Sequence, residues 1–202
     1  MVSSDDTRPR RRADAERSIA RIVAAARVAL SRDPDATADD IAKAAGVGRM
    51  TLYGHFRTRP DLVEAAMADA LRAGEETLGG LDLTGDARDA LTRLLESSWS
   101  LVSESAALLL AAQKVLPEGR VRDLHSDAAE RVEELIHRGQ EQGVFRTDLS
   151  TVWLVNAVQY ILHGAAEEIR AGRLTTAEAA GVVTATVQSM LAAPAPATPA
   201  SR

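Results

Sequence analysis

The sequence predicts an all-α fold, in which a small N-terminal helical domain is followed by a larger helical body. Apolar residues recur at spacings of three and four along most of the chain. The first such stripe comprises Ile19, Ile22, Val23, Ala26 and Leu30. This spacing places apolar side chains on one face of a helix. Capping signals and glycines separate the segments, as expected at helix ends.

The N-terminal domain is expected to hold three helices before residue 60. Its helical segments run from Asp14 to the RDPD stretch at 32–35, from 37 to 45, and from 49 to 56. Thr37 and Asp40 form a capping box at the start of the second segment. Gly46 follows that segment, at the place where a left-handed residue is favoured.

Helical patterns continue through the body of the chain. A fourth helix opens at Thr58, a second N-cap signal, and the glycine-rich stretch at 78–86 marks a boundary. The expected helices beyond it cover 87–102, 105–116, 121 to about 143, 151–166 and 176–191. The last of these contains GVVTATV, which also fits a strand. We favour a helix because Thr175 and Glu178 form a capping box and a lone strand would have no partner.

Four regions follow from this organisation. The expected ranges are a disordered basic arm at 1–12, a DNA-binding domain at 13–59, a helical domain at 60–192, to which the family resemblance adds ligand binding and dimerisation, and a disordered tail at 193–202. The DNA-binding assignment comes from the two short helices on either side of GVG (46–48), which match a helix-turn-helix. In that motif the second helix enters the DNA major groove with its N-terminal residues.

The third segment has the residues that a groove-bound helix needs. Leu52 and Phe56 lie one turn apart and are expected to face inward. The outward residues would be Arg49, Thr51, Tyr53, Gly54 and His55. Arginine can form two parallel hydrogen bonds with guanine, the hydroxyl and imidazole groups can bind phosphate oxygens, and glycine allows close approach. The alternative is an ordinary solvent-facing surface on a short helix.

Charge and composition narrow the function classes. Residues 1–60 carry 12 Lys and Arg against 8 Asp and Glu, a net charge of +4, whereas residues 61–202 carry 12 against 21, a net charge of −9. A basic head on an acidic body indicates that the head binds a polyanion, although chance also explains the asymmetry. The absence of cysteine excludes disulfides and thiol chemistry. No apolar run approaches the ~18 residues of a membrane span, and the N-terminus lacks a signal-peptide core, so we expect a cytoplasmic protein.

The segment TADDIAKAAGVGRMTLYGHFRTRPDLVEAAM (37–67) resembles the DNA-binding segment of TetR-family transcriptional regulators. The matching positions are Thr37, Ile41, Ala42, Ala45, Gly46, Val47, Thr51, Leu52, Tyr53, His55, Phe56 and Arg59. RGQEQGVFR (138–146) and the apolar helix after it also resemble the family's C-terminal domain. Gly48 departs from the pattern, because a serine often caps the recognition helix there. Arg59 replaces a common lysine and is still expected to reach phosphate.

The resemblance implies a repressor-like switch. A homodimer would place two recognition helices on a near-palindromic operator, and a small ligand in the C-terminal domain would move the fourth helix and spoil their spacing. The implied DNA-binding residues are Thr37, Gly48, Arg49, Met50, Thr51, Tyr53, Gly54, His55 and Arg59. Arg8, Arg10, Arg11 and Arg12 form either a minor-groove arm or a solubilising tail.

The helix at 151–166 is apolar on more than one side and is expected to join a two-fold, four-helix interface. The residues expected there are Val152, Leu154, Val155, Val158, Tyr160, Ile161 and Leu162, with Val183, Val187 and Met190 of the last helix. A ligand cavity is expected to be lined by Leu95, Trp99, Leu109, Gln113, Leu124, His125 and Tyr160, which suits a mostly apolar molecule. Core packing explains the same residues.

Other functions fit the sequence less well. A helical regulator without a small-molecule ligand is the main alternative. An enzyme would need a convergent catalytic set, and none is found, so no catalytic residue and no cofactor is assigned. The four histidines lack metal-ligand spacing, so no metal site is expected either. A helical interaction module would not explain the polar third segment.

Overall fold

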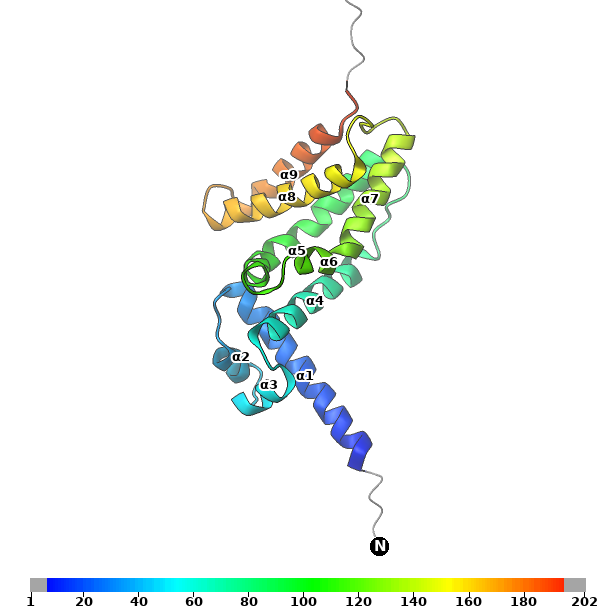
Figure 1. Cartoon of the computed structure of the whole chain (residues 1–202). Coiled ribbons are helices and arrows are strands. Elements are labelled where there is room, and N and C mark those ends of the chain that lie inside the picture. Colours follow the sequence, from blue (N-terminus) through cyan, green and yellow to red (C-terminus); the bar gives the residue numbers. More distant parts are fainter. Residues whose placement is uncertain (1–6, 195–202) are drawn as a thin grey trace, which may run out of the picture. The chain divides into compact units, whose positions relative to one another are not determined.

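The computed structural model describes residues 7–194, and within this range the predicted all-α fold is confirmed (Figure 1). The helices are α1 (Thr7–Arg32), α2 (Ala38–Ala44), α3 (Arg49–His55), α4 (Arg59–Leu78), α5 (Ala87–Val115), α6 (Arg120–Leu124), α7 (Ser126–Glu141), α8 (Thr151–Arg170) and α9 (Thr176–Leu191). None of these described helices combines the length and apolarity that a bilayer crossing requires.

The ends of α2 form as the sequence predicts. The Thr37 hydroxyl accepts a hydrogen bond from the Asp40 amide, and the Asp40 carboxylate accepts one from the Thr37 amide. At the other end Gly46 takes a φ of +65°, which costs glycine little. The Val47 amide then bonds the Ala42 carbonyl and the Gly46 amide bonds the Lys43 carbonyl, which is a Schellman motif. Together these caps fix the length of α2 and the direction in which the chain leaves it.

Three expected boundaries differ in the structure. α1 begins at Thr7, so the part of the predicted arm from Thr7 to Arg12 is helical rather than disordered. The segments expected at 87–102 and 105–116 form one helix, α5, because no proline or glycine lies between them. Conversely, the helix expected from residue 121 is broken at His125 into α6 and α7. Residues 1–6 and 195–202 lie outside the described part of the chain.

The chain divides into two compact units, and the division differs from the predicted boundary at residue 60. Unit 1 holds the described residues up to Ala73 together with Glu104–Leu124, and unit 2 holds Gly74–Ser103 and the described residues from His125 onward. α5 therefore contributes its first part to unit 2 and its second part to unit 1. The head predicted at residues 13–59 thus shares one unit with segments that the sequence analysis assigned to the body.

Unit 1 is built around an apolar core that holds α2 and α3 against α1. α2 packs on α1 and α3 packs on α2. The largest buried side chains of this core are Ile22, Leu30, Ile41, Leu52, Met67 and Leu108. Full burial of such a side chain stabilises the fold by roughly 1.5–3 kcal/mol relative to exposure. The short helices α2 and α3 are too short to persist alone, so this burial keeps them folded.

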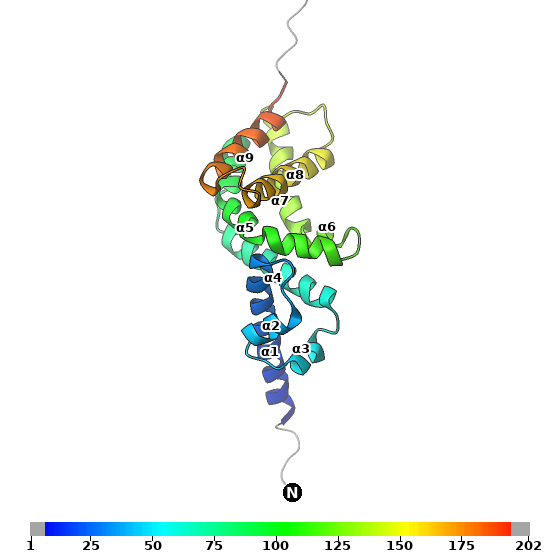
Figure 2. The ribbon, with the colours of Figure 1, turned by 90° about the vertical axis from the view of Figure 1, so that its left-hand side faces the viewer.

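Unit 2 contains α7, α8 and α9, of which α8 packs on both of the others. α8 and α9 are antiparallel and lie side by side (Figure 1, Figure 2). The turn after α7 places the buried Phe145 ring against Gly139, where an added Cβ would clash with the ring. The Arg146 amide then bonds the Leu191 carbonyl at 2.8 Å and ties this turn to the end of α9.

Some of the residues expected in a two-fold interface are instead buried within unit 2. Leu154, Val155, Val158, Val183 and Val187 are buried within unit 2 and form part of its core. Ile161, Leu162 and Met190 are half-buried, whereas Val152 and Tyr160 remain exposed. α8 is therefore apolar on two sides, as predicted, and five of the ten named residues of α8 and α9 belong to the core of unit 2.

Candidate DNA-binding site

The recognition-helix candidate α3 has one buried side and one exposed side. Leu52 is 1% exposed and Phe56 is also buried, so both face the core as predicted. In contrast, Met50 is 84% exposed, and Arg49, Thr51, Tyr53 and Gly54 are exposed as well. His55 is half-buried and presents only part of its ring to solvent. The exposed side of α3 therefore carries small and polar groups with one flexible apolar chain.

Gly48 caps α3 through its backbone alone. Its φ and ψ of −71° and 150° are those of an N-cap residue, but it makes no side-chain hydrogen bond to the helix. Its carbonyl accepts hydrogen bonds from the amides of Thr51 and Leu52. Glycine is a weaker cap than serine only by a few tenths of a kcal/mol. The departure at Gly48 thus leaves α3 formed.

Arg49 contacts an acidic side chain of α2 and an aromatic ring of α3, and the sequence analysis predicted neither contact. Its Nη1 is 2.8 Å from Oδ2 of Asp39, an exposed residue in the first turn of α2. Its Cζ lies 5.4 Å from the centre of the Tyr53 ring, within the range of a cation–π contact. Ten residues separate Asp39 from Arg49, so only the helix-turn-helix geometry brings them together.

Thr37 serves the cap of α2. Besides accepting the Asp40 amide, its hydroxyl donates to the Asp40 carboxylate. That side-chain hydrogen bond, followed by the one from the Thr37 amide, lowers the pKa of Asp40 below its usual value. The hydroxyl proton is therefore engaged within the protein, and Thr37 fixes the start of α2.

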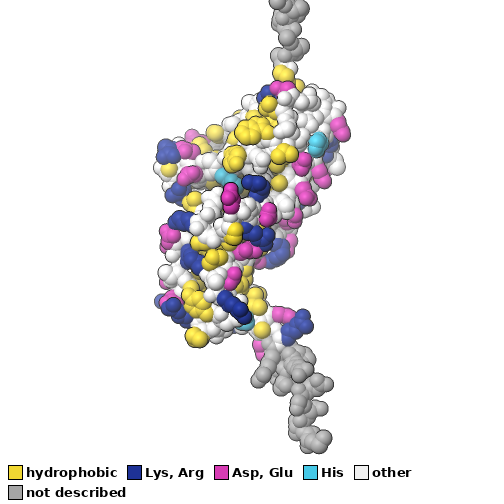
Figure 3. All heavy atoms as spheres, in the orientation of Figure 1, with side chains coloured by type: hydrophobic (Ala, Val, Ile, Leu, Met, Phe, Trp, Pro, Cys, Tyr) yellow, Lys and Arg dark blue, Asp and Glu magenta, His cyan; other side chains and the backbone are white. Residues whose placement is uncertain are grey.

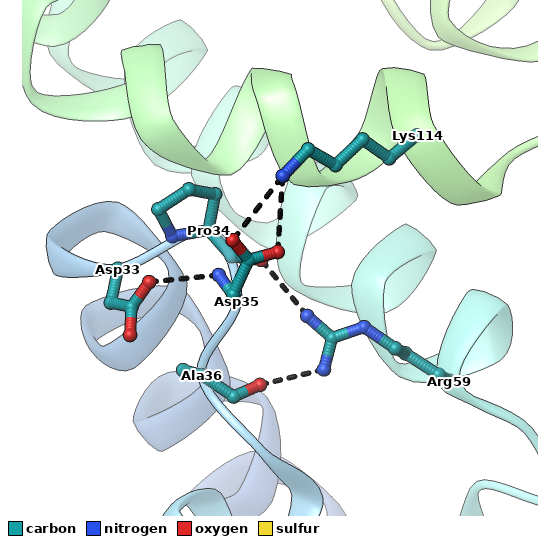
Figure 4. Close-up of polar contacts among 6 residues, drawn as sticks. All are labelled: Asp33, Pro34, Asp35, Ala36, Arg59 and Lys114. Carbon is teal, nitrogen blue, oxygen red and sulfur yellow. Dashed lines mark hydrogen bonds and ion pairs between the residues drawn. The ribbon is translucent and has the colours of Figure 1, made fainter.

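The sequence predicted that Arg59 reaches a DNA phosphate, but its guanidinium binds the protein's own backbone. Its Nη1 donates to the Ala36 carbonyl at 2.6 Å and its Nη2 to the Pro34 carbonyl at 2.9 Å, as Figure 4 shows. These carbonyls belong to the turn between α1 and α2, and the planar guanidinium suits two acceptors at once. We therefore assign Arg59 to the positioning of this turn, which corrects the predicted phosphate contact.

The same turn is held from a second direction. Lys114 of α5 lies 3.0 Å from Oδ1 of Asp35 (Figure 4). At the start of α4, Thr58 and Asp61 exchange amide-to-side-chain hydrogen bonds at 3.0 and 3.2 Å, which confirms the second N-cap signal. The turn before α2 and the start of α4 after α3 are thus both held by side-chain contacts.

Two further cations of unit 1 were not singled out by the sequence analysis. Lys43 of α2 and Arg57, which follows α3, are exposed, and neither has an ion pair within the described part of the chain. The net charge of +4 over residues 1–60 is the only sequence signal that includes them. Their charged groups face solvent, whereas the guanidinium of Arg59 donates to two backbone carbonyls. Arg12, the one arm residue whose side chain is described, pairs with Glu16 on α1.

The predicted ligand-binding residues are not brought together as one set. Leu109 and Leu124 pack with the core of unit 1, and Gln113 is exposed. Tyr160 is 69% exposed on α8, so it does not line an interior cavity of unit 2. Leu95, Trp99 and His125 belong to unit 2, where Leu95 and Trp99 are buried. Core packing accounts for Leu109 and Leu124, and Gln113 and Tyr160 lie at the surface, so the ligand-binding set stays a prediction.

Unit 2 also holds a buried indole nitrogen and a half-buried histidine. The Trp99 indole Nε1 is buried without a hydrogen-bond partner among the described residues. His163 of α8 lies with its ring centre 6.0 Å from that of His125. Burial, and then the repulsion from His125, lower the pKa of His163 to about 4, so it is neutral at pH 7. Within residues 7–194, no three His, Asp or Glu side chains are arranged to hold a metal ion.

Comparison with known proteins decides the family. Residues 22–66, which contain α2, α3 and the capped start of α4, match the model of the bacterial regulatory proteins of the tetR family. The chain carries the helix-turn-helix segment of the TetR family. It is similar to the HTH-type transcriptional regulator NfxB of Pseudomonas aeruginosa, with 26% identity over 167 residues that cover 79% of this chain and 87% of the relative. Members of the TetR family are DNA-binding transcriptional regulators, and this chain is one.

Solved structures share its fold across both units. A TetR-family regulator from Agrobacterium tumefaciens has a TM-score of 0.70 at 19% identity and covers 88% of this chain and 99% of its own. LfrR from Mycobacterium smegmatis, in complex with proflavine, has a TM-score of 0.68 at 22% identity, with coverages of 87% and 97%. FadR from Bacillus subtilis, in complex with stearoyl-CoA, has a TM-score of 0.70 at 13% identity, with coverages of 85% and 98%.

Proposed function

We propose that this chain is a ligand-responsive repressor that binds a near-palindromic operator as a homodimer and leaves it when a small, mostly apolar molecule binds. The observation that carries the DNA-binding part is the division of α3 into a buried side of Leu52 and Phe56 and an exposed side of small and polar residues. A short helix presented in this way by a helix-turn-helix is the element that enters the major groove.

The roles of the exposed residues follow from their chemistry. We assign Arg49 to a guanine, with two hydrogen bonds to O6 and N7, and Met50 to an apolar contact in the groove. Thr51, Tyr53 and His55 are assigned to phosphate oxygens, and Gly48 and Gly54 to close approach of the backbone. Lys43 and Arg57 join them as phosphate contacts, whereas Thr37 and Arg59 position α2.

A second copy of the chain is the proposed cover for the outer side of α8 and α9. Val152 and Trp153 of α8 are 67% and 56% exposed, and Tyr160 and Val182 are exposed too. Figure 3 shows apolar side chains gathered over these two helices. Aromatic residues are enriched in protein interfaces, and a two-fold pairing of two such heads matches a palindromic site. The glycines at 164 and 181 have open space around them, so a partner can approach closely there.

The ligand part of the proposal rests on unit 2. LfrR and FadR, which share the fold, are bound to proflavine and stearoyl-CoA respectively. In this chain the unpartnered Trp99 Nε1 and the neutral His163 are polar groups of the kind that orient a mostly apolar ligand. A molecule with a hydrogen-bond acceptor is favoured over a purely apolar one, because it would pair the indole donor of Trp99.

Binding to DNA fragments tests the proposal. A duplex selected from a random library by the full-length protein should bind at roughly 10⁻⁸–10⁻¹¹ M, with an affinity that falls steeply as salt rises. The selected sites should contain two related half-sites. A protein that enriches no sequence from the library would contradict the proposal. Screening compounds for release of the selected duplex, with Trp fluorescence as a second signal, tests the ligand separately.

A further inference from the structure

An acidic side chain lies beside the residue proposed to read a base. Asp39 of α2 has 58% of its side-chain surface exposed, and its Oδ2 is 2.8 Å from Nη1 of Arg49. The neighbouring Asp40, not Asp39, forms the capping box with Thr37. The start of α2 is thus capped without Asp39, and its carboxylate is directed to Arg49 on α3.

Folding stability does not account for this ion pair. Arg49 is 62% exposed as well, and an ion pair between two such side chains adds little to stability because water and salt screen it. A carboxylate near a DNA-binding helix also repels phosphates, which weakens binding to all sequences. The pair therefore opposes raw affinity and does little for the fold, so its effect is expected in the choice of DNA sequence.

The geometry leaves Arg49 able to bind a base while it is held. A guanidinium carries five donors in a rigid fork, and Asp39 contacts one nitrogen, Nη1. The Tyr53 ring, 5.4 Å from Cζ, contacts the group from another side. The edge formed by Nε and Nη2 provides two adjacent donors, as the O6 and N7 atoms of guanine require.

We propose that Asp39 is a specificity-determining residue that positions Arg49 for a guanine and restrains it from binding phosphate. A held arginine loses less side-chain freedom when it meets the correct base, so the specific complex keeps its affinity. On other sequences the held guanidinium is not free to turn to a phosphate, so non-specific binding is weakened. This inference rests on the proposed function, because it requires that α3 meets DNA.

The test compares two affinities in the full-length protein. A duplex selected by the wild-type chain and a random-sequence duplex of equal length are titrated at several salt concentrations. Asp39→Asn should bind the random duplex roughly three- to tenfold more tightly, with a salt slope steeper by about 0.9, which is one added phosphate contact. The selected duplex should not gain affinity, so the ratio of specific to random affinity falls by about fivefold or more.

Asp123→Asn is the matched control. It removes the same negative charge from the same unit, and Asp123 lies on α6 at 4.0 Å from Arg120 rather than beside Arg49. This control should leave the ratio unchanged. A ratio that is unchanged in Asp39→Asn, or that falls equally in Asp123→Asn, would overturn the inference. Asp39→Ser, a good residue for the first turn of a helix, repeats the test if the asparagine variant melts early.

A second comparison separates positioning from direct repulsion. In an Arg49→Gln background, Asp39→Asn should no longer change the ratio, because the residue that Asp39 positions is gone. A persistent change would show that Asp39 acts on DNA directly and would reject the positioning role. If the wild-type chain selects no sequence at all, the proposed function fails together with this inference. If it selects one and the ratio is insensitive to Asp39, the inference fails alone.

Discussion

The third and eighth helices each bury one side and expose the other, yet their exposed sides are of opposite kinds. α3 buries Leu52 and exposes Arg49 and Thr51. α8 buries Leu154 and exposes Trp153. The buried sides are alike because both must fill a core. The exposed sides differ because, in the proposed function, α3 meets the polar surface of DNA and α8 meets a second copy of the chain.

The comparison shows which exposed side requires an explanation. A polar exposed side is already well solvated, so water alone accounts for it. An apolar side costs free energy in water in proportion to its area, at about 25 cal/mol per Å². Trp153 and Tyr160 therefore indicate a covering partner more strongly than the polar residues of α3 indicate DNA by their exposure alone. The division of α3 supports DNA binding because it occurs within a helix-turn-helix that matches the family model.

The largest effect should come from a charge on the outer side of α8. Trp153→Glu removes a buried aromatic from the proposed interface, and each two-fold dimer contains the substitution twice. The dimer should lose roughly 3–6 kcal/mol of association free energy, which sedimentation velocity would detect as a shift to monomer. Gln113→Glu adds the same charge at an exposed position of α5 and should leave the dimer intact. A wild-type chain that sediments as a monomer at micromolar concentration would rule out the proposed interface.

The next effect concerns the two sides of α3. Leu52→Ala should lower the free energy of unfolding by about 2–5 kcal/mol, because it leaves a cavity under the recognition helix. Thr51→Ala, one residue away on the exposed side, should change stability by less than about 0.5 kcal/mol and weaken DNA binding. Urea unfolding and DNA titration on the same samples separate the two outcomes. Equal losses of stability would mean that the two sides of α3 are not distinct.

The sequence predicted the head in detail because its signals are local. The capping box of Thr37 and Asp40 and the left-handed Gly46 involve residues within a few positions of one another. The ion pair of Asp39 with Arg49, and the contacts of Arg59 with Pro34 and Ala36, join residues 10 to 25 positions apart, and no periodicity encodes them. The predicted ligand residues are not encoded in this way either, since Leu109 looks the same in a core as beside a ligand.

The inner side of α8 has a pH dependence of its own. The pKa of His163 is lowered from 6.5 to about 4 in the folded chain, so the unfolded chain binds the proton first as the pH falls. Stability should therefore fall between about pH 6.5 and pH 4, by on the order of 3 kcal/mol at most. His163→Gln should remove that part of the slope in urea unfolding measured across this range. A wild-type curve as flat as that of the variant would show that His163 is not held in a dry site.

The smallest effect distinguishes two arginines of the head. Arg59→Ala removes both hydrogen bonds to the turn between α1 and α2, so it should lower the free energy of unfolding by about 2 kcal/mol. Arg59→Lys should recover only part of this, because an ammonium group cannot match the planar fork across two carbonyls. Below the melting temperature, neither variant should change the salt dependence of DNA binding.

Arg49→Ala should show the reverse behaviour. Its side chain is exposed, so stability should change by less than about 0.5 kcal/mol. Specific binding should weaken by about 1–3 kcal/mol, and preference should relax at a single base pair. Melting curves and titrations against single-base variants of the selected duplex distinguish the two arginines. A stable Arg59→Ala protein whose salt slope falls by about 1 would restore Arg59 to the phosphate contact that the sequence first indicated, and would mean that the turn holds its shape without it.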